Sequence, residues 1–134
     1  MGMGLDDKEV KMDNIQMADI AKRYVEIINS HDLEAMCSLF AEDAYQEDPV
    51  GNEPNIGIDA IREFYTHVLS SDIQAEITGS TRCAGNSLAF PFDVFLGMEG
   101  SNLKLEVIMV FEFNEEGKIK TMKAYWGAEN CSEV

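Results

Sequence analysis

The order in which two hydrophobic periodicities occur along the chain is the feature that most restricts its fold. In the first half, apolar residues recur at helical spacing, as at Ile20, Tyr24 and Ile27. In the second half, apolar and polar residues alternate over long stretches, as they do in strands with one buried face. Helices followed by a run of strands predict an α+β domain, in which the helices cover one face of a curved antiparallel sheet.

Breaks in these patterns predict three helices and five strands. The first helix follows a cap at Asp13 or Asn14 and ends at His31. Asp32 then caps a short second helix, with Phe40 on its apolar face. The other predicted elements are a strand over residues 44–48, a helix over 58–69, and strands over 73–82, 88–96, 103–113 and 118–126.

The length of 134 residues fits one domain, which we place at residues 14–134. Residues 1–13 are a polar leader that is predicted to be disordered, and they lack the apolar core of a signal peptide. No apolar run is long enough to span a membrane. The cysteines Cys37, Cys83 and Cys131 form no CxxC pair, which favours reduced thiols. Together these features predict a cytoplasmic protein.

The charge of the chain is strongly negative. Ten basic residues against 25 acidic ones give a formal charge of −15 at pH 7. Such a protein repels the phosphate backbone of nucleic acids and anionic membrane surfaces. We therefore expect neither kind of partner, and we interpret the charge as a contribution to solubility.

Several chemistries have no signature in the sequence. The two histidines, His31 and His67, have no ligand spacing with another metal donor. No GxSxG, Walker or GxGxxG motif occurs. We therefore expect neither a metal nor a cofactor.

Two residues are candidates for chemistry on local grounds. Asp48 precedes Pro49, and proline holds the preceding residue in extended geometry, so Asp48 is predicted at a rigid strand end. An aspartate that simply starts a turn has the same pattern. Tyr24 lies on the apolar face of the first helix, where a buried phenol needs a hydrogen-bond partner. A core tyrosine bonded to backbone fits that position too, and Tyr65 and Trp126 are open to the same two interpretations.

A set of segments, taken in order, resembles one known family. They are Arg23-Tyr24, EDPVG at residues 47–51, IREFY at 61–65, LEVIMV at 105–110 and GKIKTMKAYW at 117–126. Their order and spacing resemble the bacterial ketosteroid isomerases, or steroid delta-isomerases, of the SnoaL-like and nuclear transport factor 2-like superfamily. The resemblance runs from the first helix to the C-terminus, and it implies a cone-shaped α+β fold with an apolar pocket.

The resemblance implies a role for each of five residues. Asp48 matches the general base of the family, and Tyr24 matches the phenol that donates a hydrogen bond to the steroid ketone. Tyr65 matches a tyrosine that supports this phenol. Trp126 matches an aromatic residue near the base, and Phe92 matches one that lines the pocket.

One position departs from the family. The family places a second, protonated acid beside the phenol, and this chain has Met109 there. Methionine cannot donate a hydrogen bond to a developing oxyanion. Met109 shares a strand face with Val107 and Phe111, so its side chain is expected to point into the pocket.

Three functional hypotheses follow. The first is a cofactor-independent steroid delta-isomerase that acts on a small apolar, steroid-like carbonyl ligand. The second is a related dehydratase or polyketide cyclase that uses Asp48 and Tyr24. The third is a non-catalytic carrier or dimerisation module, for which a pocket base is unnecessary. An epoxide hydrolase of this fold would need an Asp-Arg-Asp set, which we cannot place in the sequence.

A homodimer is also implied, since the family pairs through its sheet and the outer strand face contains Ile108 and Val110.

Overall fold

A computed structural model of the chain describes residues 12–134. Residues 1–11 of the predicted disordered leader lie outside the described residues. The described part begins with a helix cap. Asp13 accepts a hydrogen bond from the backbone N–H of Gln16 at 2.8 Å, and the Gln16 side chain accepts from the Asp13 N–H at 3.0 Å. This reciprocal capping box satisfies two backbone donors at the start of the first helix.

The three predicted helices are present, as α1 (Asn14–Ser30), α2 (Leu33–Ser38) and α3 (Ile58–Leu69). His31 ends α1 in the left-handed conformation, with φ of 58°, and Asp32 caps α2 through its side chain. The predicted place of Phe40 on the second helix is wrong, because this residue begins a strand. In the described residues, no helix is long and apolar enough to cross a bilayer.

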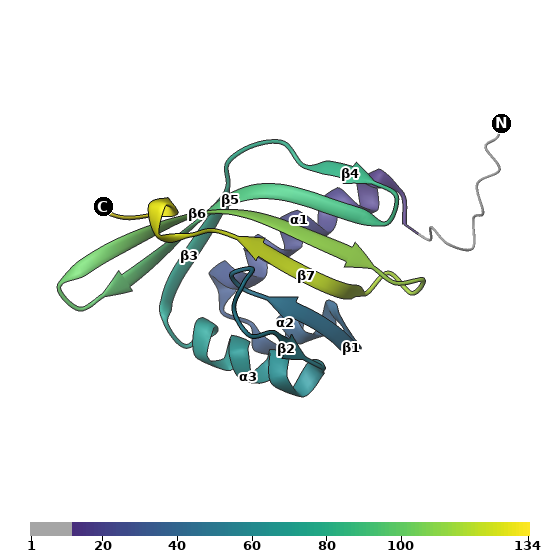
Figure 1. Cartoon of the computed structure of the whole chain (residues 1–134), viewed down its shortest axis with the longest axis horizontal. Helices are drawn as coiled ribbons and strands as arrows, with labels where there is room; N and C mark the ends of the chain where they lie inside the picture. Colours follow the sequence, from purple (N-terminus) through teal and green to yellow (C-terminus); the bar gives the residue numbers. More distant parts are fainter. Residues whose placement is uncertain (1–11) are drawn as a thin grey trace.

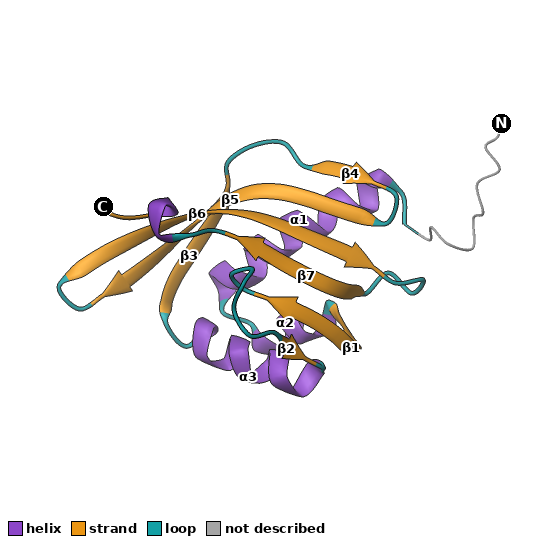
Figure 2. Cartoon of the chain, viewed as in Figure 1, coloured by secondary structure: helices purple, strands orange, loops and turns teal. Residues whose placement is uncertain are grey.

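Eight strands form one sheet within residues 12–134 (Figure 2). The order is β2-β1-β7-β6-β5-β3, with β4 paired to β5 and β8 paired to β6. The strands are β1 (Phe40–Glu47), β2 (Asn55–Ile56), β3 (Asp72–Ile77), β4 (Arg82–Ala84), β5 (Ser87–Met98), β6 (Ser101–Phe113), β7 (Ile119–Tyr125) and β8 (Cys131–Glu133).

The sheet is antiparallel as predicted, apart from the parallel pair β1 and β7. Alternation along a strand reports which face is buried and not the direction of its partner, so the sequence carried no signal for this pair. Strand β1 is also longer than the predicted 44–48, because it begins directly after α2.

The predicted strand over residues 73–82 is two strands, β3 and β4. Both pair with β5, and the pairing breaks after the Ile77–Phe92 pair and resumes at Arg82–Ala89. Pro91 of β5 lies opposite this break, and proline has no N–H to give to a neighbouring strand. The short strands β2 and β8 and a 3-10 turn over Ala128–Asn130 were not predicted.

The helices cover one face of the sheet (Figure 1). Helix α1 runs behind β5 and β6 in this view and contacts β3, β4 and β5, whereas α3 packs against β1, β2 and β3. Helix α2 bridges α1 and α3. The hydrophobic core fills the space between these two layers, which is the arrangement that the helical and strand periodicities predicted.

A side chain of α1 holds the edge of the sheet. Asn29 accepts a hydrogen bond from the backbone N–H of Ala75 at 2.7 Å and donates to its carbonyl oxygen at 2.9 Å. Ala75 is buried in β3, the last strand at this end of the sheet. The amide therefore replaces the missing neighbouring strand and fixes α1 against the edge.

Replacing Asn29 with Ala should lower the free energy of unfolding by about 1–2 kcal/mol, because two hydrogen bonds to a buried residue are lost. Chemical denaturation measures this change. Asn102→Ala, at an exposed position of β6, is the control and should change stability by less than about 0.5 kcal/mol. Equal effects of the two variants would contradict the role of Asn29 in holding the edge of the sheet.

Candidate active site

A cavity of about 200 Å³ lies between the helices and the inner face of the sheet. A single buried water needs only about 10–15 Å³ by the same kind of measure, so this cavity has room for a ligand. Most of its wall is apolar and comes from α1, α3, β3, β5 and β6. The polar side chains on the wall are Tyr24, Asp48, Tyr65, Ser71 and Trp126, and Asp48 is the one carboxylate among the described residues that line it.

Asp48 lies at the point where β1 ends. Two contacts on β7 and just beyond it hold this strand end: the Val50 N–H donates to the carbonyl of Ala124 at 2.8 Å, and Trp126 Nε1 donates to Asp48 Oδ1 at 2.9 Å. Asp48 continues the inward side of β1, whereas Glu47 lies on the other side and accepts a hydrogen bond from the Gly51 N–H. The strand end therefore directs one carboxylate into the cavity.

The environment of Asp48 makes it a stronger base than an exposed aspartate. The residue as a whole is half-buried, but protein atoms surround its carboxyl group. Burial raises the pKa of Asp48 above its ordinary value of 3.8, and the hydrogen bond from Trp126 partly opposes this rise. The cause of the raised pKa is the loss of solvation of the charged form.

Tyr24 and Tyr65 form a buried hydrogen-bonded pair, as expected. Their hydroxyl oxygens are 2.8 Å apart, and the two residues are 2% and 1% exposed. Burial, followed by the nearby charge of Asp48, raises the pKa of Tyr24, whereas the hydrogen bond between Tyr24 and Tyr65 lowers it. Burial also raises the pKa of Tyr65. Both phenols are therefore protonated at neutral pH and can act as hydrogen-bond donors.

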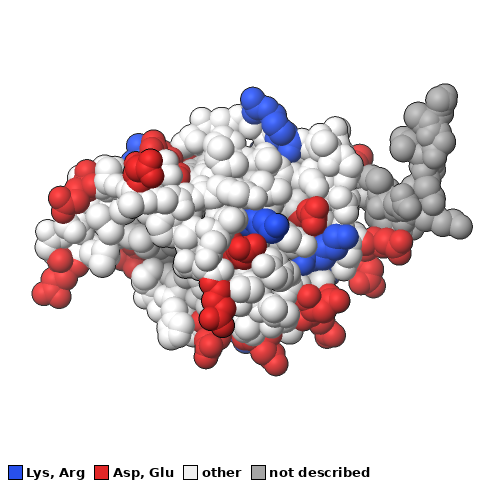
Figure 3. All heavy atoms as spheres, in the orientation of Figure 1, with Lys and Arg blue, Asp and Glu red and all other residues white. Residues whose placement is uncertain are grey.

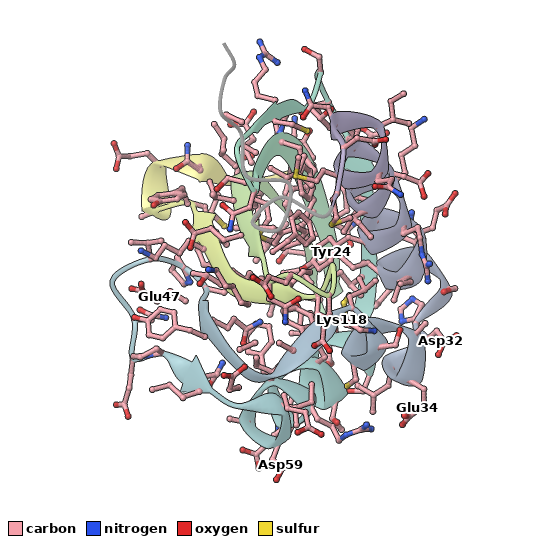
Figure 4. All side chains as sticks on the ribbon, turned by 90° about the vertical axis from the view of Figure 1, so that its right-hand side faces the viewer. Tyr24, Asp32, Glu34, Glu47, Asp59 and Lys118 are labelled. Carbon is pink, nitrogen blue, oxygen red and sulfur yellow. The ribbon has the colours of Figure 1, made fainter. Side chains whose placement is uncertain are left out.

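Aromatic side chains of the sheet fix the ring of Tyr24. Phe90, Phe92 and Phe111 meet it edge to face, with ring centroids 6.3, 6.0 and 5.4 Å away. Phe92 also lines the cavity, as the family resemblance implied. Figure 4 shows Tyr24 in the interior of the molecule, while Glu34 and Asp59 lie at its periphery. The hydroxyl of Tyr24 thus has little freedom to move.

Met109 does not have the surroundings that the sequence predicted. It lies on the inner face of β6, between Phe90 of β5 and Ala124 of β7, and is 1% exposed. It is not among the residues that line the cavity, whereas Val107, two positions earlier, is. The shared strand face was predicted correctly, but the cavity ends before it reaches Met109.

Sequence reasoning missed Gln46, which is fully buried beside the phenol pair. Its signal was available, since Gln46 lies two positions before Asp48 on the same side of a strand. No group of three or more His, Cys, Asp or Glu residues within residues 12–134 is arranged to hold a metal ion. The chemistry that these side chains offer is proton transfer by a carboxylate, next to a neutral phenol donor.

The environment of Asp48 has a consequence for stability. Its raised pKa means that the folded protein still binds the proton at pH values where the unfolded chain has released it. Ionisation of Asp48 therefore lowers stability, fully above the folded pKa and not at all below the ordinary value of 3.8.

We expect Asp48→Asn to melt a few degrees higher than the wild type at pH 7, and this difference should disappear as the pH falls below 3.8. Thermal unfolding followed across this pH range tests the expectation. The exposed Asp43→Asn on β1 is the matched control for the loss of one negative charge. A melting temperature of Asp48→Asn below that of the wild type at pH 7 would contradict the destabilising effect of the Asp48 charge.

Comparisons with known proteins agree with this fold. Residues 21–122 match the SnoaL-like domain family. A steroid delta-isomerase from Nocardioides simplex is 33% identical over 104 residues, which cover 78% of this chain and 84% of that protein. The epoxide hydrolase LasB from Streptomyces lasalocidi is 31% identical over 120 residues, and the match covers 85% of this chain but only 42% of LasB.

Among solved structures, the epoxide hydrolase/cyclase-like enzyme SalBIII, which has a role in pyran ring formation in the polyether salinomycin, superposes with a TM-score of 0.85. Its sequence is 26% identical, and the match covers 91% of this chain and 98% of SalBIII. These three relatives are enzymes, an isomerase and two of the epoxide hydrolase or cyclase type. On the extent of the family match and of the isomerase similarity, the chain belongs to the SnoaL-like domain family.

Proposed function

We propose that this protein is a cofactor-independent isomerase that moves a double bond into conjugation with a ketone in a small, apolar, steroid-like substrate. The observation that carries the proposal is one carboxylate of raised pKa that shares an apolar cavity with a neutral phenol. Similarity to a steroid delta-isomerase supports the same reaction class.

In this reaction Asp48 is the general base. A carbonyl acidifies the carbon beside it, and the Asp48 carboxylate takes a proton from that carbon to leave a dienolate. The protonated Asp48 then returns the same proton to the far carbon of the conjugated system. Nothing is gained or lost overall, so one carboxylate serves both steps. Burial favours this role because it raises the pKa of the carboxyl group.

Tyr24 is the donor to the substrate oxygen. Negative charge develops on this oxygen as the dienolate forms, and a fixed, water-excluded donor stabilises that charge. The three phenylalanines around Tyr24 hold its hydroxyl in place before the reaction begins. Met109 offers no second donor, and the loss of one such donor typically lowers kcat by about 10²- to 10³-fold. We therefore expect turnover that is slower than with two donors but still catalytic.

A second candidate function is epoxide opening, which the similarities to LasB and SalBIII favour. This reaction needs a donor to the epoxide oxygen and a base for the attacking oxygen, and Tyr24 and Asp48 can fill these roles. The wall of the described cavity carries no arginine and no second acid, so the Asp-Arg-Asp set remains without a counterpart. Conversion of an apolar epoxide to a diol or a cyclic ether, with no turnover of enones, would favour this candidate.

The isomerase proposal predicts the behaviour of two variants on an androstene-dione substrate. Asp48→Asn keeps the side-chain shape but removes the base, and it should lower kcat by about 10²- to 10⁴-fold. Tyr24→Phe should lower kcat by about 10²- to 10³-fold. The absorbance of the conjugated enone product measures turnover.

Asp43→Asn, which changes an exposed carboxylate on the same strand, should retain wild-type turnover. Near-full activity of Asp48→Asn would refute the role of Asp48 as the base. The absence of turnover in the wild-type protein would refute the isomerase itself.

We also propose that two copies pair through the outer face of the sheet. Ile108 of β6 and Tyr125 of β7 are neighbours in register on this face and are 52% and 46% exposed. In Figure 3, acidic side chains are scattered over the visible face and gather toward its two ends and lower edge. Each chain has a formal net charge of −15, so two copies repel each other, and apolar contacts near the middle of the sheet can offset this repulsion.

Ile108→Glu should convert the dimer to a monomer, because it places two like charges in the interface. Sedimentation velocity measures the change. The matched control is Ile56→Glu, which also places a charge at an exposed isoleucine. Ile56 is 66% exposed and lies on β2, the first strand of the sheet, which is separated from β6 by β1 and β7. A wild-type protein that sediments as a monomer at high concentration would contradict this pairing.

A further inference from the structure

Gln46 is the one fully buried polar residue in the part of the chain that the structure describes, with an exposure of 0%. It lies on β1, and its neighbours at two-residue spacing, Ala44 and Asp48, also face the interior. A buried amide costs stability unless its donors and acceptor are satisfied. The partners of Gln46 therefore indicate what this side chain does.

Both ends of the Gln46 amide are held. Asn55 Nδ2 donates to Gln46 Oε1 at 2.8 Å, which directs the Gln46 NH₂ group away from Asn55 and further into the core. Gln46 Nε2 donates to Met122 Sδ at 3.4 Å, and the hydroxyl of Tyr65 donates to the same sulfur at 3.3 Å. Burial raises the pKa of Tyr65, and hydrogen bonding by Gln46 acts in the opposite direction. Gln46 thus shares the Met122 sulfur with Tyr65, and it is not among the residues that line the cavity.

Whether Tyr24 can donate to a ligand depends on the number of protons that the two phenols share, and this is where Gln46 matters. Each phenol has a single proton to donate. While Tyr65 donates to Met122, the proton between the two hydroxyls must come from Tyr24, and Tyr24 then has none for a ligand. For Tyr24 to donate into the cavity, Tyr65 has to turn its proton toward Tyr24. The Met122 sulfur then keeps its hydrogen bond from Gln46 Nε2, and the oxygen of Tyr65 is free to accept one. The Gln46 amide has a second N–H, and its effect on the pKa of Tyr65 is that of a neighbouring donor.

We propose that Gln46, oriented by Asn55, is a positioning residue that directs the hydrogen-bond chain from Gln46 through Tyr65 to Tyr24 toward the ligand oxygen. This inference rests on the proposed role of Tyr24 as the donor to that oxygen. Every donor in the chain then points the same way, and each bond in such a series strengthens the next one. Negative charge on the ligand oxygen is the state that gains most from this order.

A flat phenol tests the proposal without any turnover. 2-Naphthol bound at Tyr24 can ionise, and its naphtholate resembles the dienolate in shape and charge. The ratio of bound naphtholate to bound neutral naphthol is measured by absorbance in an Asp48→Asn background. This background is needed because Asp48 is protonated, and hence uncharged, when the dienolate exists.

Gln46→Met keeps the length of the side chain and removes the N–H donors. It should lower the ratio of naphtholate to naphthol by about tenfold, the effect of losing one hydrogen bond in a chain that ends on a charge. Tyr65→Phe should lower the ratio as well. Adding Gln46→Met to Tyr65→Phe should change the ratio less than about twofold more, because Gln46 acts through Tyr65. Met36→Leu, at a fully buried position of α2, controls for a change in core packing and should leave the ratio unchanged.

Two results would overturn the role of Gln46. One is a ratio in Gln46→Met within twofold of the parent protein, including the absence of naphtholate from both proteins. The other is an equal loss when Gln46→Met is added to Tyr65→Phe, since an additive effect is that of an independent structural residue. Failure of the isomerase proposal gives a different result. In that case the variants change the ratio of naphtholate to naphthol as expected, but the wild-type protein turns over no enone.

Discussion

The parallel pairing of β1 with β7 is the constraint on which the rest of the structure depends. It joins the helical half of the chain to the strand half, since β1 follows α2 directly and β7 is the last long strand. It also builds the site, because the end of β1 carries Asp48 and the residue after β7 is Trp126. A carboxylate at a free strand end would be solvated and weakly basic. Held between two strand ends, it is enclosed and its pKa rises.

Residues far apart in sequence complete the site from the other layer. Tyr24 comes from α1 and Tyr65 from α3, and their hydroxyls meet only because both helices pack on the same face of the sheet. The sheet then supplies the phenylalanines that restrain Tyr24. The two layers therefore contribute different things: the end of strand β1 gives the carboxylate and the helices give the phenols. This division keeps a charged group and neutral donors on separate, rigid supports.

The parts of this arrangement that the sequence predicted are those with a local signal. Amphipathic spacing located the three helices, and alternation located β5, β6 and β7. Pro49 indicated that Asp48 lies at a strand end, and a helical face indicated that Tyr24 lies on the apolar side of its helix, whereas the roles of both came from a family resemblance. The β1–β7 direction, the break opposite Pro91 and the surroundings of Met109 depend on pairing between distant strands, which periodicity does not encode. Gln46 was missed because a glutamine in a short strand is ordinarily solvated, although its two-residue spacing from Asp48 placed both residues on the same face of the strand.

The contact between Asn29 and β3 also bears on how this protein behaves at high concentration. The last strand of an open sheet exposes a row of N–H and C=O groups that can recruit a strand from another molecule and start aggregation. Asn29 occupies one N–H and one C=O of that row, at Ala75, and α1 lies against the same strand. One amide side chain thereby blocks the middle of an edge on which a neighbouring copy could otherwise begin a continuous intermolecular sheet.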